Sequence, residues 1–324
     1  MNTMKWLLRR EFWEHKGSMF WAPLIVGSLI VLLISSVMIY GAVMGEFEGQ
    51  LKVHGKTEQL TAMFNSLPLE KRQHIGDAAA MAYMGAAVPL LLMMSIIAFF
   101  YCLGALHDER RDRSILFWKS LPVSDTETVL SKVVTAAVVT PLIALGVGIG
   151  VSLVLFMIVG TMAALHGVNL FGLVLSNANF YLVPLRLLGL LPVYILWALP
   201  TIGWLMLVSA WAKSKVFLWA VGVPVITIVV FKWIEHLMNL SFNFNWFFEH
   251  VISRALVGLI PGVWLPLTSG HKPWEVNAAS TGVLADVFTQ SWLTLATPQA
   301  LIGALVGAAM IYAAIRMRRW KDEG

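Results

Sequence analysis

Long stretches without a charged side chain constrain this sequence more than any other feature. Residues 78–106 contain no Asp, Glu, Lys or Arg, and after Lys132 none occurs until Arg186. A helix needs about 20 apolar residues to cross the hydrocarbon core of a membrane, which is about 30 Å thick. With 58% hydrophobic and 13% charged residues, the chain cannot cover its surface with polar groups as a soluble protein does. The sequence therefore predicts an integral membrane protein.

Six apolar runs predict an all-α, polytopic membrane protein with six transmembrane helices in one transmembrane domain, residues 1–324. Residues 42–80 and 161–181 contain more polar side chains, and we expect loops there. The sixth span begins between residues 292 and 300 and ends at 315, and the other five lie at residues 19–40, 81–106, 133–160, 187–211 and 216–231.

Residues 1–18 interleave basic and aromatic side chains, which is typical of a helix at the cytoplasmic surface of a membrane. Met4, Leu8 and Phe12 follow one another at a spacing of four and would form its apolar stripe. The alternative is that this segment continues the first span.

Residues 232–290 form the longest segment outside the predicted spans. Its apolar run at 251–267 is interrupted by Arg254, Pro261 and Pro266, which favours a re-entrant or surface-lying helix on the extracytoplasmic side. A seventh span at 251–267 is the alternative.

The distribution of basic residues predicts the orientation. Most of the 23 Lys and Arg residues fall at the N-terminus, at residues 107–132, at the short link 213–215 and at the C-terminus. Cytoplasmic segments of membrane proteins carry an excess of Lys and Arg, so we expect both termini in the cytoplasm. A seventh span would place the basic C-terminus outside, against this rule.

No motif for catalysis, nucleotide binding or metal binding is evident. The segment Gly55-Lys56-Thr57 lacks the glycine that a phosphate loop needs five residues earlier, because that position is Gln50. None of the eight histidines is three or four residues from another, so none pairs on a helix face as metal ligands do. Ion-driven carriers usually need ionisable groups within their spans, and the six predicted spans have none. We expect no catalytic residue, no metal and no cofactor in this chain.

Residues 107–124 form a dense charged segment between the second and third spans. Glu109 and Arg113 have the spacing of a helical ion pair, and Phe117 and Trp118 give the segment an apolar tip that could anchor a partner protein. The alternative is a solvated loop that only sets the topology. Ser124 and Glu127 form a capping box, which predicts that the next helix begins near Asp125.

Two pairs of glycines are spaced for close helix packing. Gly146 and Gly150 lie in the third span, and Gly303 and Gly307 lie in the sixth. We expect Gly146 and Gly150 to pack within the subunit, with a role in lining a substrate path as the alternative.

The charged segment from Asp108 to Ser124, continuing to Ser131-Lys132, resembles the cytoplasmic segment of bacterial ABC-2 type transporter permeases. In that family the segment forms the coupling helix between the second and third spans. The N-terminal residues Arg10, Glu11, Phe12, Trp13 and Glu14 are similar to the opening connecting helix of the family.

The resemblance implies an ABC-2, type V exporter-like permease in the bacterial cytoplasmic (inner) membrane. Such a chain is a half-transporter that forms the substrate pathway as a homodimer, or as a heterodimer with a similar permease, among membrane lipids and without nucleic acid. It is not itself an enzyme, because a separate ABC ATPase (nucleotide-binding) subunit binds ATP and Mg and hydrolyses the ATP. The residues expected to couple to that subunit are Glu109, Arg110, Arg111, Arg113, Phe117 and Trp118. A non-transporting assembly or sensor protein that docks a cytoplasmic partner through the same loop is the alternative.

Overall fold

The protein is described here from a computed structural model. The structure describes residues 3–43, 50–53, 56–59, 66–120, 122–238, 248–269 and 283–320.

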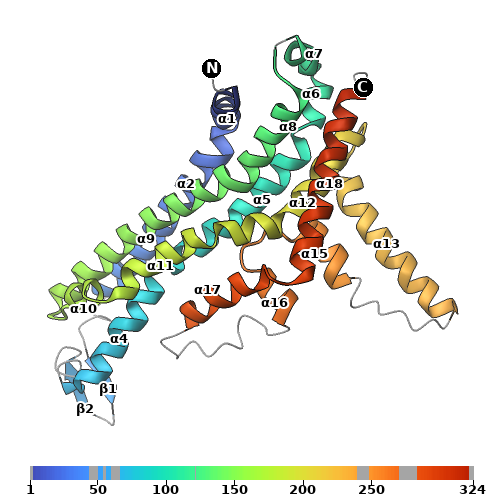
Figure 1. Ribbon diagram of the computed structural model, residues 1–324. Helices are drawn as coiled ribbons and strands as arrows, with labels where there is room; N and C mark the ends of the chain where they lie inside the picture. The colour runs from blue at the N-terminus through green and yellow to red at the C-terminus, as the bar shows by residue number, and fades with distance from the viewer. Residues whose placement is uncertain are drawn as a thin grey trace.

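Six helical segments are long and apolar enough to cross a membrane, and they give the molecule its elongated form (Figure 1). The prediction of a helical, polytopic membrane protein with six spans is therefore confirmed. These segments are Gly17–Gly41, Leu69–Arg111, Asp125–Leu165, Ala178–Trp211, Val216–Leu237 and Pro298–Trp320.

The N-terminal helix α1 (Thr3–Glu14) leads into the first span through a short π-helical turn, Gly17–Trp21. Helix α2 (Ala22–Val43) then runs at an angle to α1 (Figure 1). The buried residues of α1 are Leu7 and Glu11. Met4, Leu8 and Phe12 are half-buried, and the contact of this stripe with a membrane surface stays a prediction.

The second and third spans are long composite helices. The second combines α4 (Leu69–Ala82), a 3₁₀ turn at Tyr83–Ala87 and α5 (Val88–Gly104). The third combines α8 (Asp125–Val134), a π-helical turn at Thr135–Val139 and α9 (Thr140–Leu165). Two short helices, α6 (His107–Arg111) and α7 (Ser114–Lys119), connect them.

The predicted start, near Asp125, of the helix that leads into the third span is confirmed. Ser124 Oγ accepts a hydrogen bond from the Glu127 amide at 3.1 Å, and Glu127 Oε2 accepts one from the Ser124 amide at 3.1 Å. This reciprocal capping fixes the beginning of α8 at Asp125.

The prediction of a loop at residues 161–181 is wrong. Helix α9 continues to Leu165, and α10 (Leu170–Leu175) and α11 (Ala178–Gly189) follow. Two of the polar residues in this region are helix caps: Asn169 accepts from the Gly172 amide at 2.8 Å, and Asn177 accepts from the Asn179 amide at 2.9 Å. Asparagine is common at such positions because its side-chain oxygen accepts a hydrogen bond from a free backbone amide of the first turn.

The region 42–80 also contains more regular structure than a loop. Strands β1 (Gln50–Val53) and β2 (Lys56–Gln59) pair antiparallel, and α4 begins at Leu69. Lys56 and Thr57 therefore lie on a strand, whereas a phosphate loop leads into a helix.

Helix α12 (Leu191–Trp211) is largely buried, with Trp197, Ile202 and Leu205 in the core. It packs along α18 (Pro298–Trp320), while α13 (Val216–Met238) diverges from both (Figure 1). Gly307 permits the close approach of α18, because a Cβ at this position would lie 2.6 Å from the carbonyl oxygen of Leu199.

The expectation that Gly146 and Gly150 pack within the subunit is wrong for the part of the chain that the structure describes. A Cβ added at either position would meet no atom within 4 Å. The neighbouring Gly148 faces inward instead, where a Cβ would lie 2.8 Å from Ala87 Cβ. The inward face of α9 is therefore offset from the predicted one.

The segment after α13 folds into short pieces. A π-helical turn at Phe248–Ile252, α15 (Ser253–Leu256), α16 (Trp264–Ser269) and α17 (Val283–Thr294) precede α18. The Gly258 amide donates to Thr201 Oγ1 at 3.0 Å, and Ser95 Oγ donates to the Leu259 carbonyl at 2.8 Å. Residues 251–267 thus form no continuous helix and are packed against α5 and α12.

Both ends of the described chain lie at the same end of the molecule, together with α6 and α7, and the β1–β2 hairpin and α10 lie at the opposite end (Figure 1). This arrangement follows from an even number of spans, and we call the first end the α6–α7 end.

Candidate docking site on the α6–α7 segment

A buried group of charged side chains joins four helices at the α6–α7 end. We call it the ion-pair cluster. Glu11 of α1, Glu109 of α6, Lys132 of α8 and Arg318 of α18 are each at most 8% exposed. The cluster also includes two residues at its edge, Arg10 and Asp125.

Glu109 lies at the centre of the ion-pair cluster. Its Oε1 is 3.1 Å from Lys132 Nζ and 3.7 Å from Arg10 Nη2. Its Oε2 accepts a hydrogen bond from Arg318 Nη1, and Arg318 Nε donates to Asp125 at 3.0 Å. The carboxylate of Glu109 therefore connects α6 to α1, α8 and the end of α18.

Glu11 holds α1 against the third span in the same way. Lys132 Nζ donates to both of its carboxylate oxygens, at 3.1 and 3.2 Å, and the Tyr101 hydroxyl donates to Oε2 at 2.8 Å. His15 packs edge-on against Tyr101, with ring centroids 4.8 Å apart. Burial lowers the pKa of His15. Its imidazole is therefore neutral at neutral pH and adds no charge to the cluster.

The charges of the cluster balance. Arg10, Lys132 and Arg318 face Glu11, Glu109 and Asp125. Removing one partner of a buried ion pair typically costs about 3–5 kcal/mol, because the other charge is left without compensation. The cluster therefore fixes the relative positions of the helices that it joins.

Arg110 attaches α6 to the end of α12. Its Nη2 donates to the carbonyl oxygens of Ser209 at 2.6 Å and Ala212 at 3.0 Å. In return, Ser209 Oγ accepts from the amides of Leu106 and His107, both at 3.0 Å. Free carbonyls at the end of one helix and free amides at the start of the other are thus satisfied together.

The predicted helical ion pair between Glu109 and Arg113 does not form. Helix α6 ends at Arg111, and Arg113 adopts a left-handed backbone conformation with φ of 56°. Glu109 points into the ion-pair cluster instead. Arg111 is exposed and pairs with the neighbouring Asp112 at 3.2 Å.

The apolar tip of the segment is formed by Leu116 and Phe117, which are 61% and 60% exposed. Ile115 is buried beneath them. Trp118, expected in the same exposed tip, is half-buried: the Arg10 guanidinium lies 3.3 Å from the centre of its ring, and Trp6 packs beside it at 6.4 Å. Trp118 therefore links α7 to α1.

The remaining N-terminal residues lie around this contact. Trp13 is exposed, with its ring 6.3 Å from that of Phe12 and 5.0 Å from Lys16 Nζ. Glu14 pairs with Arg10 at 3.3 Å. Among the six residues expected to couple to a partner, the structure leaves Arg111, Arg113 and Phe117 exposed and uses Glu109, Arg110 and Trp118 for contacts within the chain.

Sequence reasoning did not show that Lys132, Ser209 and Arg318 hold the segment in place. Only Lys132 carried a signal, as the last charged residue before a long uncharged run. No group of three or more His, Cys, Asp or Glu residues in the described part of the chain could hold a metal ion.

No protein-family model, curated protein or solved structure matches this chain.

Proposed function

We propose that this chain is the transmembrane subunit of an ATP-driven exporter of the ABC-2 type, and that a separate cytoplasmic ATPase docks on α6 and α7. One observation supports this most strongly. The exposed apolar tip of Leu116 and Phe117 stands on a segment that is tied by buried polar contacts to α1, α8, α12 and α18.

Such a segment can both bind and transmit force. Exposed aromatic and apolar anchors that fill a pocket on a partner supply most of the energy of protein interfaces. A loop that merely set the topology would need no buried ion pairs. Because Glu109 contacts three other helices, a displacement of α6 by the docked ATPase would move the ends of the first, third and sixth spans together.

The sequence supports the assignment of ATP hydrolysis to a separate subunit. The chain has no phosphate loop, so ATP and Mg are bound by the partner subunit, and this chain is not the enzyme. The excess of basic residues at the α6–α7 end supports a cytoplasmic position for that end, in a chain that spans a bacterial inner membrane. The exporter then consists of two permease subunits, identical or similar, with two copies of the ATPase.

Affinity purification from mildly solubilised membranes tests the proposal. The tagged chain should co-purify with a second polypeptide that carries a phosphate-loop motif, and a photoreactive ATP analogue should label that polypeptide and not this chain. Phe117→Ala should reduce the amount recovered at least several-fold, because it removes an anchor typically worth about 2 kcal/mol. Trp320→Ala is the matched control, since Trp320 is also exposed and lies at the same end of the molecule.

The same experiment distinguishes the alternative function, a non-transporting assembly or sensor protein. In that case the polypeptide lost with Phe117→Ala would have no phosphate-loop motif, and the preparation would show no ATP hydrolysis. Labelling of the permease chain itself by the ATP analogue would contradict the proposed division of labour.

A further inference from the structure

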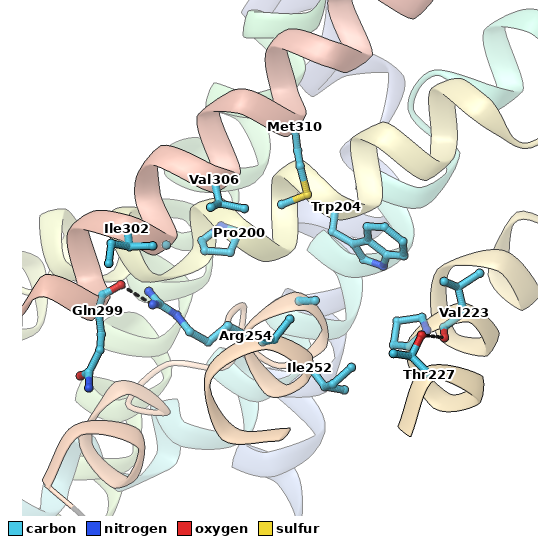
Figure 2. A pocket seen from close by; sticks show the side chains of 14 residues that line it. Pro200, Trp204, Val223, Thr227, Ile252, Arg254, Gln299, Ile302, Val306 and Met310 are labelled. Atoms are coloured by element: carbon cyan, nitrogen blue, oxygen red, sulfur yellow. Dashed lines mark hydrogen bonds between the residues drawn. The ribbon is translucent and has the colours of Figure 1, made fainter. Parts of the chain in front are cut away.

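A cavity of about 440 Å³ lies between α12, α13, α15 and α18, where α13 diverges from the other spans (Figure 1). Figure 2 shows Ile302, Val306 and Met310 of α18 on one side and Val223 and Thr227 of α13 on the other. Sites for small molecules typically measure about 300–1,000 Å³ and are mostly apolar. The size and the lining of this cavity fit that class.

The cavity is polar at one end only. The Thr227 hydroxyl donates to the Val223 carbonyl of its own helix at 2.8 Å, so it offers the cavity no free donor. Arg254 and Gln299 stand at the other end (Figure 2). The described residues that line the cavity include no Asp or Glu.

Arg254 is a buried cation without a charged partner among the described side chains. It is 6% exposed. Its guanidinium lies 4.2 Å from the centre of the Trp197 ring, and its Nη1 donates to the Gln299 carbonyl. Its Nε and Nη2 are buried and have no hydrogen-bond partner among the described residues.

The surroundings hold Arg254 in this position. Thr201 Oγ1 donates to the Arg254 carbonyl at 2.6 Å, which fixes α15 against the middle of α12. Gly303 leaves room for the guanidinium, because a Cβ at this position would overlap it. An ionisable group packed among spanning helices is costly and typically marks a functional site. Here the unsatisfied edge, formed by Nε and Nη2, is the geometry with which arginine binds a carboxylate or a phosphate through two parallel hydrogen bonds.

We propose that this cavity binds an amphiphile with an anionic head group, a carboxylate or a phosphate, which pairs with Arg254 while its apolar part lies along α13 and α18. Both free donors are covered in the present structure, so the guanidinium turns toward the cavity when the head group binds.

The lining gives the ligand a direction. Gln299 is in the first turn of α18, and Met310 is 11 residues further along the helix, or roughly 16 Å deeper at 1.5 Å per residue. The head group therefore lies beside the first turn of α18, which is the end of this helix farther from α6 and α7, and the apolar part extends along α18 toward them. This site does not depend on the proposed ATPase, because its residues lie outside α6 and α7.

Binding to the purified full chain in a neutral detergent tests the proposal, with retained ligand counted by native mass spectrometry. The probes are oleate, oleoyl lysophosphatidic acid and oleyl alcohol, which share one apolar chain and differ in the head group. At least one of the two anionic probes should bind at least tenfold more tightly than the alcohol, and comparison of the two identifies the preferred head group. Arg254→Gln should remove that preference and leave the binding of the alcohol unchanged.

Two substitutions on α18 keep the test informative if Arg254→Gln does not fold. Val306→Trp fills the cavity and should weaken the binding of all three probes at least tenfold. Leu305→Trp places the same side chain at an exposed position outside the cavity lining and should change nothing. Equal binding of the alcohol and both anionic probes to the wild-type chain, or equal effects of the two tryptophans, would overturn the proposal.

Discussion

Glu109 is the residue on which the account of the docking segment most depends. Its neighbours in sequence suggested a surface ion pair, but its carboxylate is buried between Lys132, Arg10 and Arg318. Arg318 is 209 residues away along the chain. Spacing rules report only on side chains within one helix, so this cluster could not be predicted from the sequence.

Glu109→Gln should lower the stability of the protein by about 3 kcal/mol, because Arg10, Lys132 and Arg318 then face only two carboxylates, and one buried positive charge is left uncompensated. We expect the thermal unfolding midpoint in detergent to fall by more than about 5 °C. Asp108→Asn is the control: the Asp108 side chain is 55% exposed, and surface ion pairs contribute about 0–1 kcal/mol. Equal midpoints for the two variants would mean that the ion-pair cluster does not hold the segment.

Arg254 shows the same limit of residue-level reasoning. The sequences of the six predicted spans contain no charged residue. A charged side chain from another segment nevertheless packs among them. A short helix between the fifth and sixth spans brings a guanidinium to Trp197 of the fourth. The sequence showed that Arg254 interrupts the apolar run at 251–267. It could not show which helices Arg254 packs against.

At the scale of helices, the features that depend on only a few neighbouring residues could be predicted best. The capping box at Ser124 located the start of α8, whereas the capping asparagines Asn169 and Asn177 were interpreted as loop residues. The same side chains favour caps and loops, so composition does not distinguish short helices from loops. Small-residue spacing identified Gly307 as a packing residue, but it did not show that Gly146 faces away from the bundle.

Gly307→Ala and Gly146→Ala should have opposite effects on stability. A methyl group at residue 307 would lie 2.6 Å from the Leu199 carbonyl, so α12 and α18 must separate, at a typical cost of about 1–3 kcal/mol. A methyl group at residue 146 meets open space and should add up to about 1 kcal/mol through helix propensity.

Thermal unfolding of the two glycine variants, prepared in the same detergent, measures the difference. The packing of α12 on α18 described above would be wrong if Gly307→Ala were as stable as the wild-type chain. A loss of stability in Gly146→Ala would show instead that α9 contacts another helix, such as one from a second copy.

At the scale of the whole molecule, hydropathy was sufficient to predict the six spans, because each needs only length and the absence of charge. The packing of residues 251–267 among the spans depends on contacts such as Thr201 with Gly258, which hydropathy does not report. The excess of basic residues at the α6–α7 end predicts that this end lies in the cytoplasm.

Single cysteines at the two ends of the molecule test this orientation. Cys102 is the sole native cysteine and is fully buried, so it should not react with a membrane-impermeant maleimide. In intact cells, Lys71→Cys on exposed α4 should be labelled and Arg113→Cys at the opposite end should not, while both should react after lysis. Labelling of Arg113→Cys in intact cells would show that the orientation is the reverse of the predicted one, and it would exclude a cytoplasmic partner at α6 and α7.

The most direct test of the central claim is photo-crosslinking from residue 117 in living cells. A photoreactive amino acid replaces Phe117, which is 60% exposed on α7, and in a control it replaces Phe100, which is 55% exposed within the second span. The account predicts a crosslinked product between position 117 and a polypeptide with a phosphate-loop motif, absent from position 100. Identical products from both positions, or a product from position 117 that contains no ATPase, would contradict it.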